Sequence, residues 1–368
     1  MNTFKGKVGL VQRVLPNYRA PFFDALAQAC TGGLAVFAGQ PKPDEQIQQV
    51  DHLSDALLIQ AKNLHLFSRS GYLCIQMGLM SWLKRWNPDV LIVEANPRYL
   101  RTPAAVRWMH RRQKPVIGWG LGAPPLSGTL SSLRQKRRQG FIQQFDALIT
   151  YSRTGATEYA NLGFPQDRIF VAANAVSPAP THAMPTRELP QAGQKARVLF
   201  VGRLQKRKNI DNLITACAEL PAALQPDLVI VGDGPDQQRL EKIAVARYPS
   251  TRFTGALYDQ ALAEQFYRAD LFVLPGTGGL AIQQAMIYGL PVIAAEADGT
   301  QADLICPQNG WQVPPDDTAA LTQTLQIALS DLSTLREMGK VSFRIVSEEI
   351  NLEQMVASFV AALQRSMA

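Results

Sequence analysis

The sequence has few of the residues that bind metal ions. Four cysteines and four histidines are spread through 368 residues, and they form neither a Cys-x-x-Cys pair nor a mixed cluster. Structural metal sites need such closely spaced ligands, so we expect no metal site. We interpret the cysteines as buried thiols of a protein in a reducing compartment; they are Cys30, Cys74, Cys217 and Cys306.

Long apolar runs are missing too. No stretch reaches the roughly 18 consecutive apolar residues that indicate a transmembrane helix. The first residues lead directly into a strand-like run at 8–11, without the apolar core of a secretory leader. With 46% hydrophobic and 18% charged residues, the composition is typical of a well-packed globular protein. We therefore expect a cytoplasmic protein.

Acidic residues are absent from 95–145. This block carries a net charge of +10, while the rest of the chain has 27 basic and 30 acidic residues. Such an excess favours an anionic partner, either a phosphorylated substrate or an anionic membrane surface to which Trp108 and Phe141 would add apolar contacts. No zinc-finger or RNA-binding motif accompanies it, so we expect no nucleic acid. The basic residues are Arg98, Arg101, Arg107, Arg111, Arg112, Lys114, Arg134, Lys136, Arg137 and Arg138.

Apolar runs alternate with helical patterns along the chain, which is typical of parallel sheets covered by helices. The first half predicts strands at 8–11, 33–37, 89–93, 115–119, 146–152 and 169–171, and helices at 22–29, 72–86, 103–112 and 154–162. The second half predicts strands at 197–202, 227–231, 252–255, 271–274 and 292–295, and helices at 237–246, 261–268, 280–288 and 352–365.

A proline-rich stretch without apolar periodicity separates the two halves. We expect a first domain at 1–178, a linker at 179–194 and a second domain at 195–348. The helix within 349–368 is expected to pack back on the first domain.

Three strand ends of the second half carry residues suited to a diphosphate. Gly202-Arg203 and Lys208 follow one strand, Gly232 to Pro235 follow the next, and Gly276 to Gly279 precede a helix N-terminus. A guanidinium and an ammonium can hold a pyrophosphate between them, and glycines let the backbone approach it. Together the three loops predict an anion site.

The same residues carry a resemblance to a known family. Val201-Gly202-Arg203-Leu204 with Lys208, Val231 to Pro235 and the segment 275–293 resemble the retaining family 4 glycosyltransferases. Asp146 to Ser152 and Asn174-Ala175-Val176 are similar to the end of that family's N-terminal domain. The resemblance implies the GT-B fold: an α/β protein of two Rossmann-like doubly wound domains facing a central cleft.

The resemblance also implies roles for individual residues. Arg203 and Lys208 match the diphosphate pair, which would serve in catalysis, and the donor would be a nucleotide-diphospho-sugar bound without metal or further cofactor. Gln284 matches the second glutamate of the family's E-x7-E motif, which contacts the ribose, and Gly276 stands where the first glutamate is expected. The expected donor-binding residues are Gly202, Gly234, Phe253, Leu257, Gly276, Thr277, Gly278, Gly279, Leu280 and Gln284.

The first half departs further from the family pattern. Pro16-Asn17-Tyr18-Arg19 replaces a Gly-Gly turn, and no histidine stands at 119–122. The polar groups nearest to strand ends are Glu94, which we predict as catalytic, and Asn17, Arg19 and Asn96, which we predict to bind the acceptor. No nucleophile with a paired base is visible, which disfavours a covalent hydrolase.

The leading prediction is a retaining glycosyltransferase that moves sugar to a hydroxyl of a glycan or lipid-linked acceptor, cytoplasmic or peripheral at the inner face of a membrane. Two alternatives remain open. One is a sugar-nucleotide isomerase of the same fold, which would need no acceptor. The other is a non-catalytic sugar-nucleotide-binding subunit, because Gly276 stands where the first glutamate of the family motif is expected.

Overall fold

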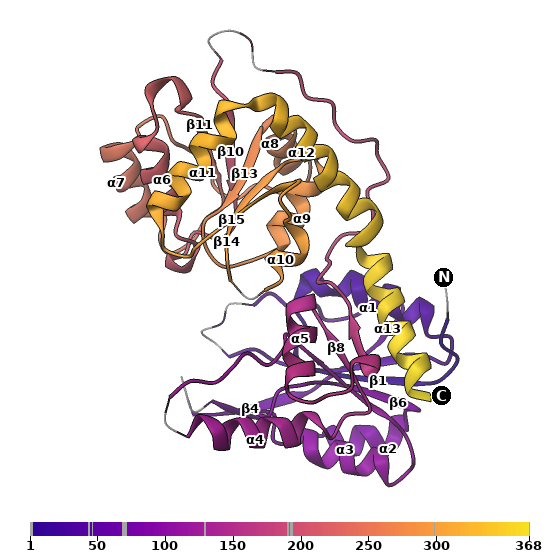
Figure 1. Cartoon of the computed structure of the whole chain (residues 1–368). Coiled ribbons are helices and arrows are strands. Elements are labelled where there is room, and N and C mark those ends of the chain that lie inside the picture. The colour runs from indigo at the N-terminus through magenta and orange to yellow at the C-terminus, as the bar shows by residue number, and fades with distance from the viewer. Residues whose placement is uncertain are drawn as a thin grey trace. The chain divides into compact units, whose positions relative to one another are not determined.

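The computed structural model describes residues 3–42, 45, 47–67, 72–128, 130–189, 191, 194–297 and 299–367. It divides into two compact units (Figure 1). The first comprises Met1–Val176 and Leu352–Ala368, and the second comprises Ser177–Asn351. Each contains a parallel sheet with helices on both faces, so the predicted pair of doubly wound folds is confirmed.

The sheet of the first unit has the order β3-β2-β1-β6-β7-β8-β9, with every neighbouring pair parallel. Its strands are β1 (Val8–Val14), β2 (Leu34–Gly39), β3 (Leu57–Gln60), β6 (Val90–Glu94), β7 (Val116–Gly120), β8 (Ala147–Thr150) and β9 (Ile169–Val171). Its helices are α1 (Ala20–Ala29), α2 (Leu79–Trp86), α3 (Thr102–His110), α4 (Ser131–Ile142), α5 (Arg153–Asn161) and α13 (Leu352–Met367).

Side-chain alternation along these strands builds two cores. Leu10, Ile92 and Ile117 point to the face covered by α1 and α13, whereas neighbouring residues of the same strands join the core under α2 to α5. Phe359 of α13 packs with its ring centroid 4.9 Å from those of Phe22 and Trp119. The last helix of the chain is therefore part of the first unit's core.

The helix predicted at 72–86 is wrong in its first half. Residues Leu73–Met77 form strand β5, which pairs antiparallel with β4 (Lys62–Leu66). The helix α2 starts only after Gly78, whose φ of +82° suits glycine. Pairing with β4, which the sequence did not reveal, outweighs the helical pattern there.

The sheet of the second unit has the order β12-β11-β10-β13-β14-β15 and is also parallel throughout. Its strands are β10 (Arg197–Val201), β11 (Asp227–Val231), β12 (Arg252–Phe253), β13 (Leu271–Leu274), β14 (Val292–Ala295) and β15 (Gly310–Val313). Its helices are α6 (Ile210–Glu219), α7 (Gln237–Arg247), α8 (Asp259–Arg268), α9 (Leu280–Ile287), α10 (Gln301–Leu304), α11 (Thr318–Ser330) and α12 (Leu332–Arg344).

The proline-rich stretch expected to be a linker is attached to the second unit. Arg187 donates hydrogen bonds to the backbone oxygens of Phe266 and Ala269 at 2.9 Å and of Gly289 at 3.3 Å. Three carbonyl acceptors match the fork of a guanidinium, and they fix this part of the chain on α8 and α9. Burial lowers the pKa of Arg187 to about 10.

Candidate active site

Strand order places the predicted diphosphate residues at one point of the second unit. The chain leaves β10 towards β11 on one side, while β13 lies on the other side. In doubly wound sheets such a topological switch point is where ligands bind, beyond the carboxyl ends of the strands. The loop 202–209 follows β10 and the loop 275–279 follows β13, so the two segments with the predicted residues meet there.

Lys208 and Arg207 join the two loops. Lys208 Nζ donates to the backbone oxygen of Thr277, and Arg207 Nη1 donates to Thr277 Oγ1 at 2.9 Å. Burial, and next the charge of Arg207, lowers the pKa of Lys208 to about 8. The ammonium thus sits where an anion would stabilise its charge. Arg203, the other predicted cation, lies exposed in the same loop.

Close backbone contacts explain why position 276 is a glycine. A Cβ there would lie 2.6 Å from Lys208 Cα, and it would also collide with the backbone oxygen of Arg207. At Gly278, where φ is +135°, a Cβ would lie 2.5 Å from Lys208 Nζ. The glutamate that the family resemblance predicts at 276 therefore cannot fit while loop 206–208 keeps this position.

Glycines also bring the β10 and β11 loops together. Gly202 N–H donates to Val231 O at 3.0 Å, and Leu204 N–H donates to Asp233 O at 2.7 Å. A Cβ at Gly234, where φ is +154°, would collide with the backbone oxygen of Leu204. These glycines let one loop approach the other, which is a structural reason for them beside the predicted approach to a ligand.

The N-terminus of α9 is partly occupied. Thr277 N–H donates to Arg207 O at 3.1 Å, so it is not available to a ligand as predicted. The N–H groups of Gly278, Gly279 and Leu280 donate to no described residue and leave donors at the positive end of the helix. Gln284 is half-buried, and its amide makes no hydrogen bond within the described part of the chain.

Two more of the predicted donor-binding residues lie in the next loop of the same edge. Phe253 ends β12 and is half-buried, as is Leu257. The backbone oxygen of Gly255, between them, accepts from Gly232 N–H at 2.8 Å. The loop after β12 is thus tied to the loop after β11, which brings Phe253 and Leu257 to the edge that carries Lys208.

The first unit has its own switch point, between β1 and β6. Glu94 ends β6, and its Oε2 accepts from the backbone N–H of Arg13 on β1 at 2.7 Å. Burial raises the pKa of Glu94 to about 7, although the bond from Arg13 opposes the shift. Arg13 itself pairs with Glu45 at 2.7 Å. Sequence reasoning found Glu94 but missed the Arg13–Glu45 pair, because neither residue belongs to a motif.

The predicted acceptor residues are not equally accessible. Arg19 is buried; its Nη2 donates to Asn174 Oδ1 at 2.6 Å, and its guanidinium lies 5.3 Å from the ring centroid of Tyr151. Asn17 is exposed, with its amide bonded to Gln48 at 3.2 Å. Asn96 is half-buried just after β6. Asn17 and Asn96 can meet a ligand directly, whereas Arg19 holds elements of the first unit together.

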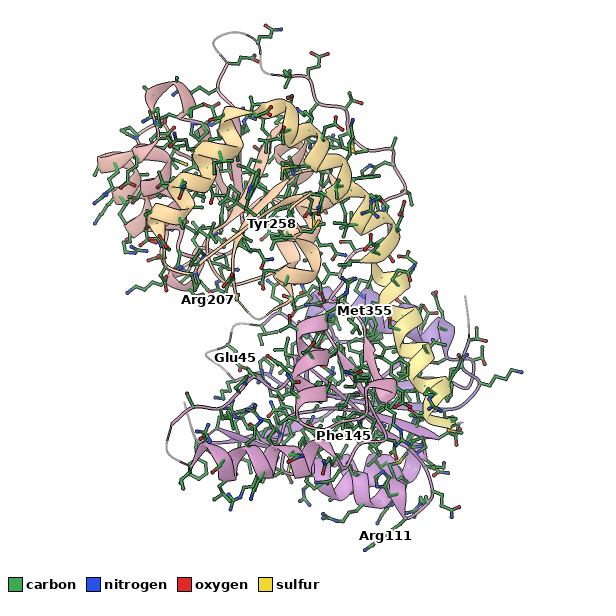
Figure 2. All side chains as sticks on the ribbon, in the orientation of Figure 1. Glu45, Arg111, Phe145, Arg207, Tyr258 and Met355 are labelled. Atoms are coloured by element: carbon green, nitrogen blue, oxygen red, sulfur yellow. The ribbon has the colours of Figure 1, made fainter. Side chains whose placement is uncertain are left out.

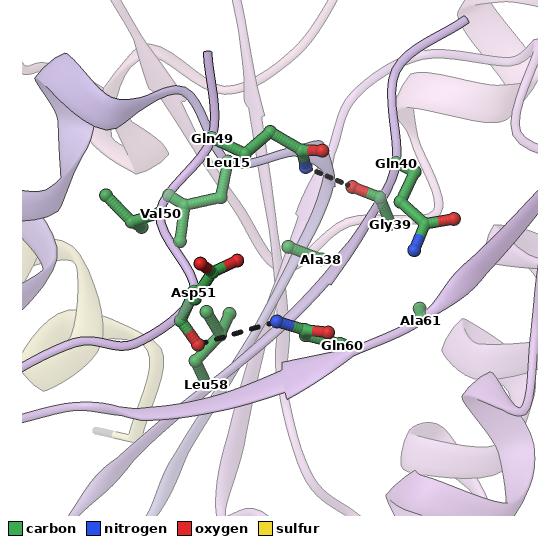
Figure 3. A pocket seen from close by; sticks show the side chains of 10 residues that line it. All are labelled: Leu15, Ala38, Gly39, Gln40, Gln49, Val50, Asp51, Leu58, Gln60 and Ala61. Carbon is green, nitrogen blue, oxygen red and sulfur yellow. Dashed lines mark hydrogen bonds between the residues drawn. The ribbon is translucent and has the colours of Figure 1, made fainter.

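A small cavity lies at the ends of β1 to β3 (Figure 3). It has a volume of about 80 Å³. The amides of Gln49 and Gln60 bond to the backbone oxygens of Gly39 and Asp51 on its wall. A water takes about 30 Å³ in the liquid, and substrate sites usually exceed about 300 Å³. The cavity therefore suits a few waters and not a sugar.

The basic block lies on α3, α4 and their loops, and the structure corrects one of its predicted anchors. Phe141 is buried, with its ring centroid 5.3 Å from that of Phe145, which lies inside the first unit (Figure 2). Trp108 is half-buried and covered by the guanidinium of Arg112 at 4.0 Å. The large exposed apolar side chains described in this region are instead Leu100, Leu121, Leu130 and Leu133. Arg111, by contrast, projects into solvent (Figure 2).

Two kinds of feature were not found among the described residues. No cluster of three or more potential metal ligands occurs there. No helix in the described ranges has the length and hydropathy needed to cross a bilayer.

Comparison with known proteins places the loops of the second unit in a family. The family described as "Glycosyl transferases group 1" matches residues 186–343, which is most of that unit. The second unit is thus similar to the group 1 glycosyltransferases over nearly its whole length. The predicted family is thereby confirmed for the second unit.

The curated relatives match the chain over different lengths. A GDP-mannose-dependent alpha-mannosyltransferase of Mycobacterium tuberculosis is 43% identical over 116 residues, which is 31% of this chain and 28% of the relative. Glycogen synthase of the same organism is 27% identical over 327 residues, covering 85% and 75%. The chain spans less than a third of the length of the first curated relatives.

A solved structure extends the likeness to the whole chain. Anabaena HepE in complex with UDP aligns with a TM-score of 0.69 and 16% identity, covering 99% of this chain and 100% of that one. Identity at this level shows the fold alone, and the predicted GT-B fold is confirmed.

Proposed function

We propose that this glycosyltransferase moves a sugar from a nucleotide-diphospho-sugar to an acceptor hydroxyl with retention of anomeric configuration, in the synthesis of a glycan, glycolipid or polysaccharide. The observation that carries the proposal is the position of Lys208 at the β10/β13 switch point, beside the α9 N-terminus. The UDP complex of HepE and the GDP-mannose dependence of the mycobacterial relative support a sugar nucleotide as donor.

The proposed chemistry assigns one task to each switch point. At the second unit, Lys208 and Arg203 hold the diphosphate and stabilise its charge as the sugar–phosphate bond breaks, without a metal. The donors of Gly278 to Leu280 add the positive end of α9. At the first unit, Glu94 accepts the proton of the acceptor hydroxyl while the oxygen of that hydroxyl bonds to the anomeric carbon.

A binding experiment tests the donor site. The Arg203→Ala/Lys208→Ala variant is expected to bind UDP and GDP at least ~100-fold more weakly than the unmodified protein, because each charge-assisted bond contributes about 1.5–3 kcal/mol. Isothermal titration calorimetry measures this. The control is Lys206→Ala, an exposed cation of the same loop, which should retain binding. Equal binding by the double variant and the unmodified protein would remove the diphosphate assignment.

A second candidate follows from the steric exclusion of a side chain at Gly276. The family resemblance predicts a glutamate near the transferred sugar, and without it a non-catalytic sugar-nucleotide-binding subunit is consistent with the same loops. Turnover separates the two readings. Release of UDP or GDP with a glycosylated product from any acceptor supports the transferase, whereas tight nucleotide-sugar binding without transfer across a broad acceptor panel supports the subunit.

We also propose that the basic block attaches the protein peripherally to an anionic membrane, at its inner face. Exposed Leu130 and Leu133 stand beside Arg134, Lys136 and Arg137 on or next to α4, a combination that suits the lipid interface. The fraction of protein that sediments with phosphatidylserine vesicles is expected to fall as the salt concentration rises. It is also expected to be lower for the Leu130→Ser/Leu133→Ser variant. Binding independent of both lipid charge and salt would contradict this proposal.

A further inference from the structure

A hollow in the first unit collects basic groups that the proposed chemistry does not use. It lies beyond the ends of β6 and β7 and has a volume of about 200 Å³. Asn96 and Arg98 line it from the loop after β6, and Arg138 lines it from α4. Ala95, also in its wall, follows Glu94 directly, so the hollow adjoins the residue assigned to the acceptor hydroxyl.

The chain around the hollow is fixed before any ligand arrives. Ala95 N–H donates to Trp119 O at 2.8 Å, and Arg98 O accepts from Cys74 N–H at 2.9 Å. Arg138 Nη1 donates to Pro124 O at 2.6 Å. Backbone bonds to two neighbouring strands thus hold the loop, and a carbonyl holds the second arginine. A preorganised site loses less entropy when it binds.

Several donors in the hollow have no partner among the described residues. Asn96 Oδ1 accepts from Arg98 N–H at 3.1 Å, which leaves the amide NH₂ to point elsewhere. Within the described part of the chain nothing accepts from that NH₂ or from the Arg98 guanidinium, and Arg138 keeps donors beyond its single bond. Donors without acceptors are the complement of an oxyanion.

The charge of the hollow is not balanced either. No acidic residue occurs at 95–145. Glu94 precedes the loop directly, and Glu158 of α5 lies behind Gly122 in the wall. Glu158 forms no ion pair with Arg138 among the described residues. Burial, and next the charge of Arg134, lowers the pKa of Arg138, so its positive charge is incompletely stabilised.

We propose that this hollow binds a phosphate group carried by the acceptor. The inference rests on the proposed transferase function and names the class of its acceptor. About 200 Å³ is less than a whole substrate needs, but it accommodates one charged group whose attached chain extends into solvent. Three donor side chains from two segments suit the several oxygens of a phosphate better than the two of a carboxylate.

The test uses the whole 368-residue chain with Arg203→Ala/Lys208→Ala, so that phosphate cannot bind at the donor loops. Calorimetric titration with glycerol phosphate is expected to show binding that Arg98→Gln and Arg138→Gln each weaken ~10-fold, the loss of one charge-assisted bond. Arg107→Gln is the matched control, because Arg107 is an exposed arginine of the same basic block outside the hollow.

Three outcomes would overturn the inference. In the first, Arg107→Gln weakens the binding of glycerol phosphate as much as Arg98→Gln or Arg138→Gln does. In the second, glucuronate binds more tightly than glycerol phosphate, and in the third neither binds. The source of the phosphate is read from a further arm with vesicles. If the chain binds vesicles of phosphatidic acid in phosphatidylcholine, and Arg98→Gln or Arg138→Gln weakens this binding, the phosphate belongs to a lipid. If it binds glycerol phosphate but not these vesicles, the phosphate belongs to a soluble acceptor.

A separate measurement keeps this inference apart from the proposed function. UDP and GDP binding is measured with Arg98→Gln and Arg138→Gln in the otherwise unmodified chain, and it is expected to stay unchanged. If the unmodified chain binds no nucleotide, the proposed function fails while the phosphate titration still stands. If nucleotide binds and glycerol phosphate does not, only the acceptor inference fails.

Discussion

At the switch point of the second unit the loops are joined backbone to backbone, whereas at that of the first unit the strands end in ionisable side chains. Gly202, Gly234 and Gly276 allow contacts that any Cβ would prevent or strain, and they leave Lys208 as a cation half-withdrawn from water. In the first unit, Glu94 is held by Arg13 N–H and retains a proton up to about pH 7. One sheet edge is suited to fixed charge and the other to proton transfer.

The difference shows how one architecture supports two tasks. Parallel sheets present strand ends and helix N-termini at one edge, which is enough to place a ligand. What the edge then does depends on whether its loops supply positive charge or a titrating carboxyl. Substitutions that affect one edge and spare the other therefore test the comparison.

The largest expected effect is on catalysis, through Glu94→Gln. If Glu94 accepts the proton, kcat should fall about 10²–10⁴-fold with little change in nucleotide binding. The unmodified enzyme should gain activity as pH rises through about 7, where Glu94 ionises, and the variant should lose this limb. If the activity of the variant still rises through about pH 7, a group other than Glu94 accepts the proton.

The same pKa has a consequence for stability. Between its ordinary value near 4.5 and about 7, folded Glu94 holds a proton that the unfolded chain releases. The free energy of unfolding contributed by this residue is therefore lost as pH rises through that window, and Glu94→Gln should remove this slope from the dependence of Tm on pH.

Next in size is Gly276→Glu, which restores the family's residue but not its function. The new side chain collides with the backbone at Arg207 and Lys208, so nucleotide binding should fall about 100-fold through displacement of that loop. Calorimetry with UDP and GDP measures it. Gly279→Ala gives the milder comparison, because its Cβ meets Thr300 Oγ1 at 3.3 Å. Improved binding in Gly276→Glu would contradict the steric account.

Phe359→Ala should separate the stabilities of the two units. Removal of a fully buried aromatic that packs on Phe22 and Trp119 costs about 3–5 kcal/mol. Because α13 belongs to the first unit, calorimetry should show an early unfolding transition while UDP or GDP still stabilises the later one. A uniform shift of both transitions would indicate that the units unfold together.

The smallest effect is expected from Lys208→Arg as a function of pH. Lys208 has its pKa lowered to about 8, so nucleotide affinity should decline as pH rises above 8, by up to ~10-fold per unit. Arginine stays charged, so the variant should bind more evenly from pH 7 to 9. A decline of equal steepness in the variant would assign the titration to another group.

Sequence patterns predicted what depends on local chemistry. Strand ends with Gly202-Arg203, Lys208 and Gly276 to Gly279 were recognisable because glycines and cations recur at fixed offsets from buried strands. Glu94 was found for the same reason, at the end of a strongly apolar run. Its elevated pKa was not predicted, because the elevation comes from burial in the folded chain and is opposed by the bond from Arg13, 81 residues earlier.

Other features depend on contacts that the sequence does not display. The β4–β5 hairpin was mistaken for helix, since the five-residue partner strand at 62–66 was not recognised. Phe141 was taken for a surface anchor because it follows a run of arginines, yet the last turn of α4 directs it onto Phe145. The collision that excludes a side chain at 276 depends on a loop 69 residues away and could only be seen in three dimensions.

The return of α13 to the first unit has a consequence for synthesis on the ribosome. Met355, Val356, Phe359, Val360 and Leu363 complete a core whose other members are translated almost 180 residues or more earlier. The second unit is contiguous in sequence and can fold once residue 351 has emerged. The first unit is thus completed only after the second unit has been translated, and this apolar face stays uncovered until α13 has been made.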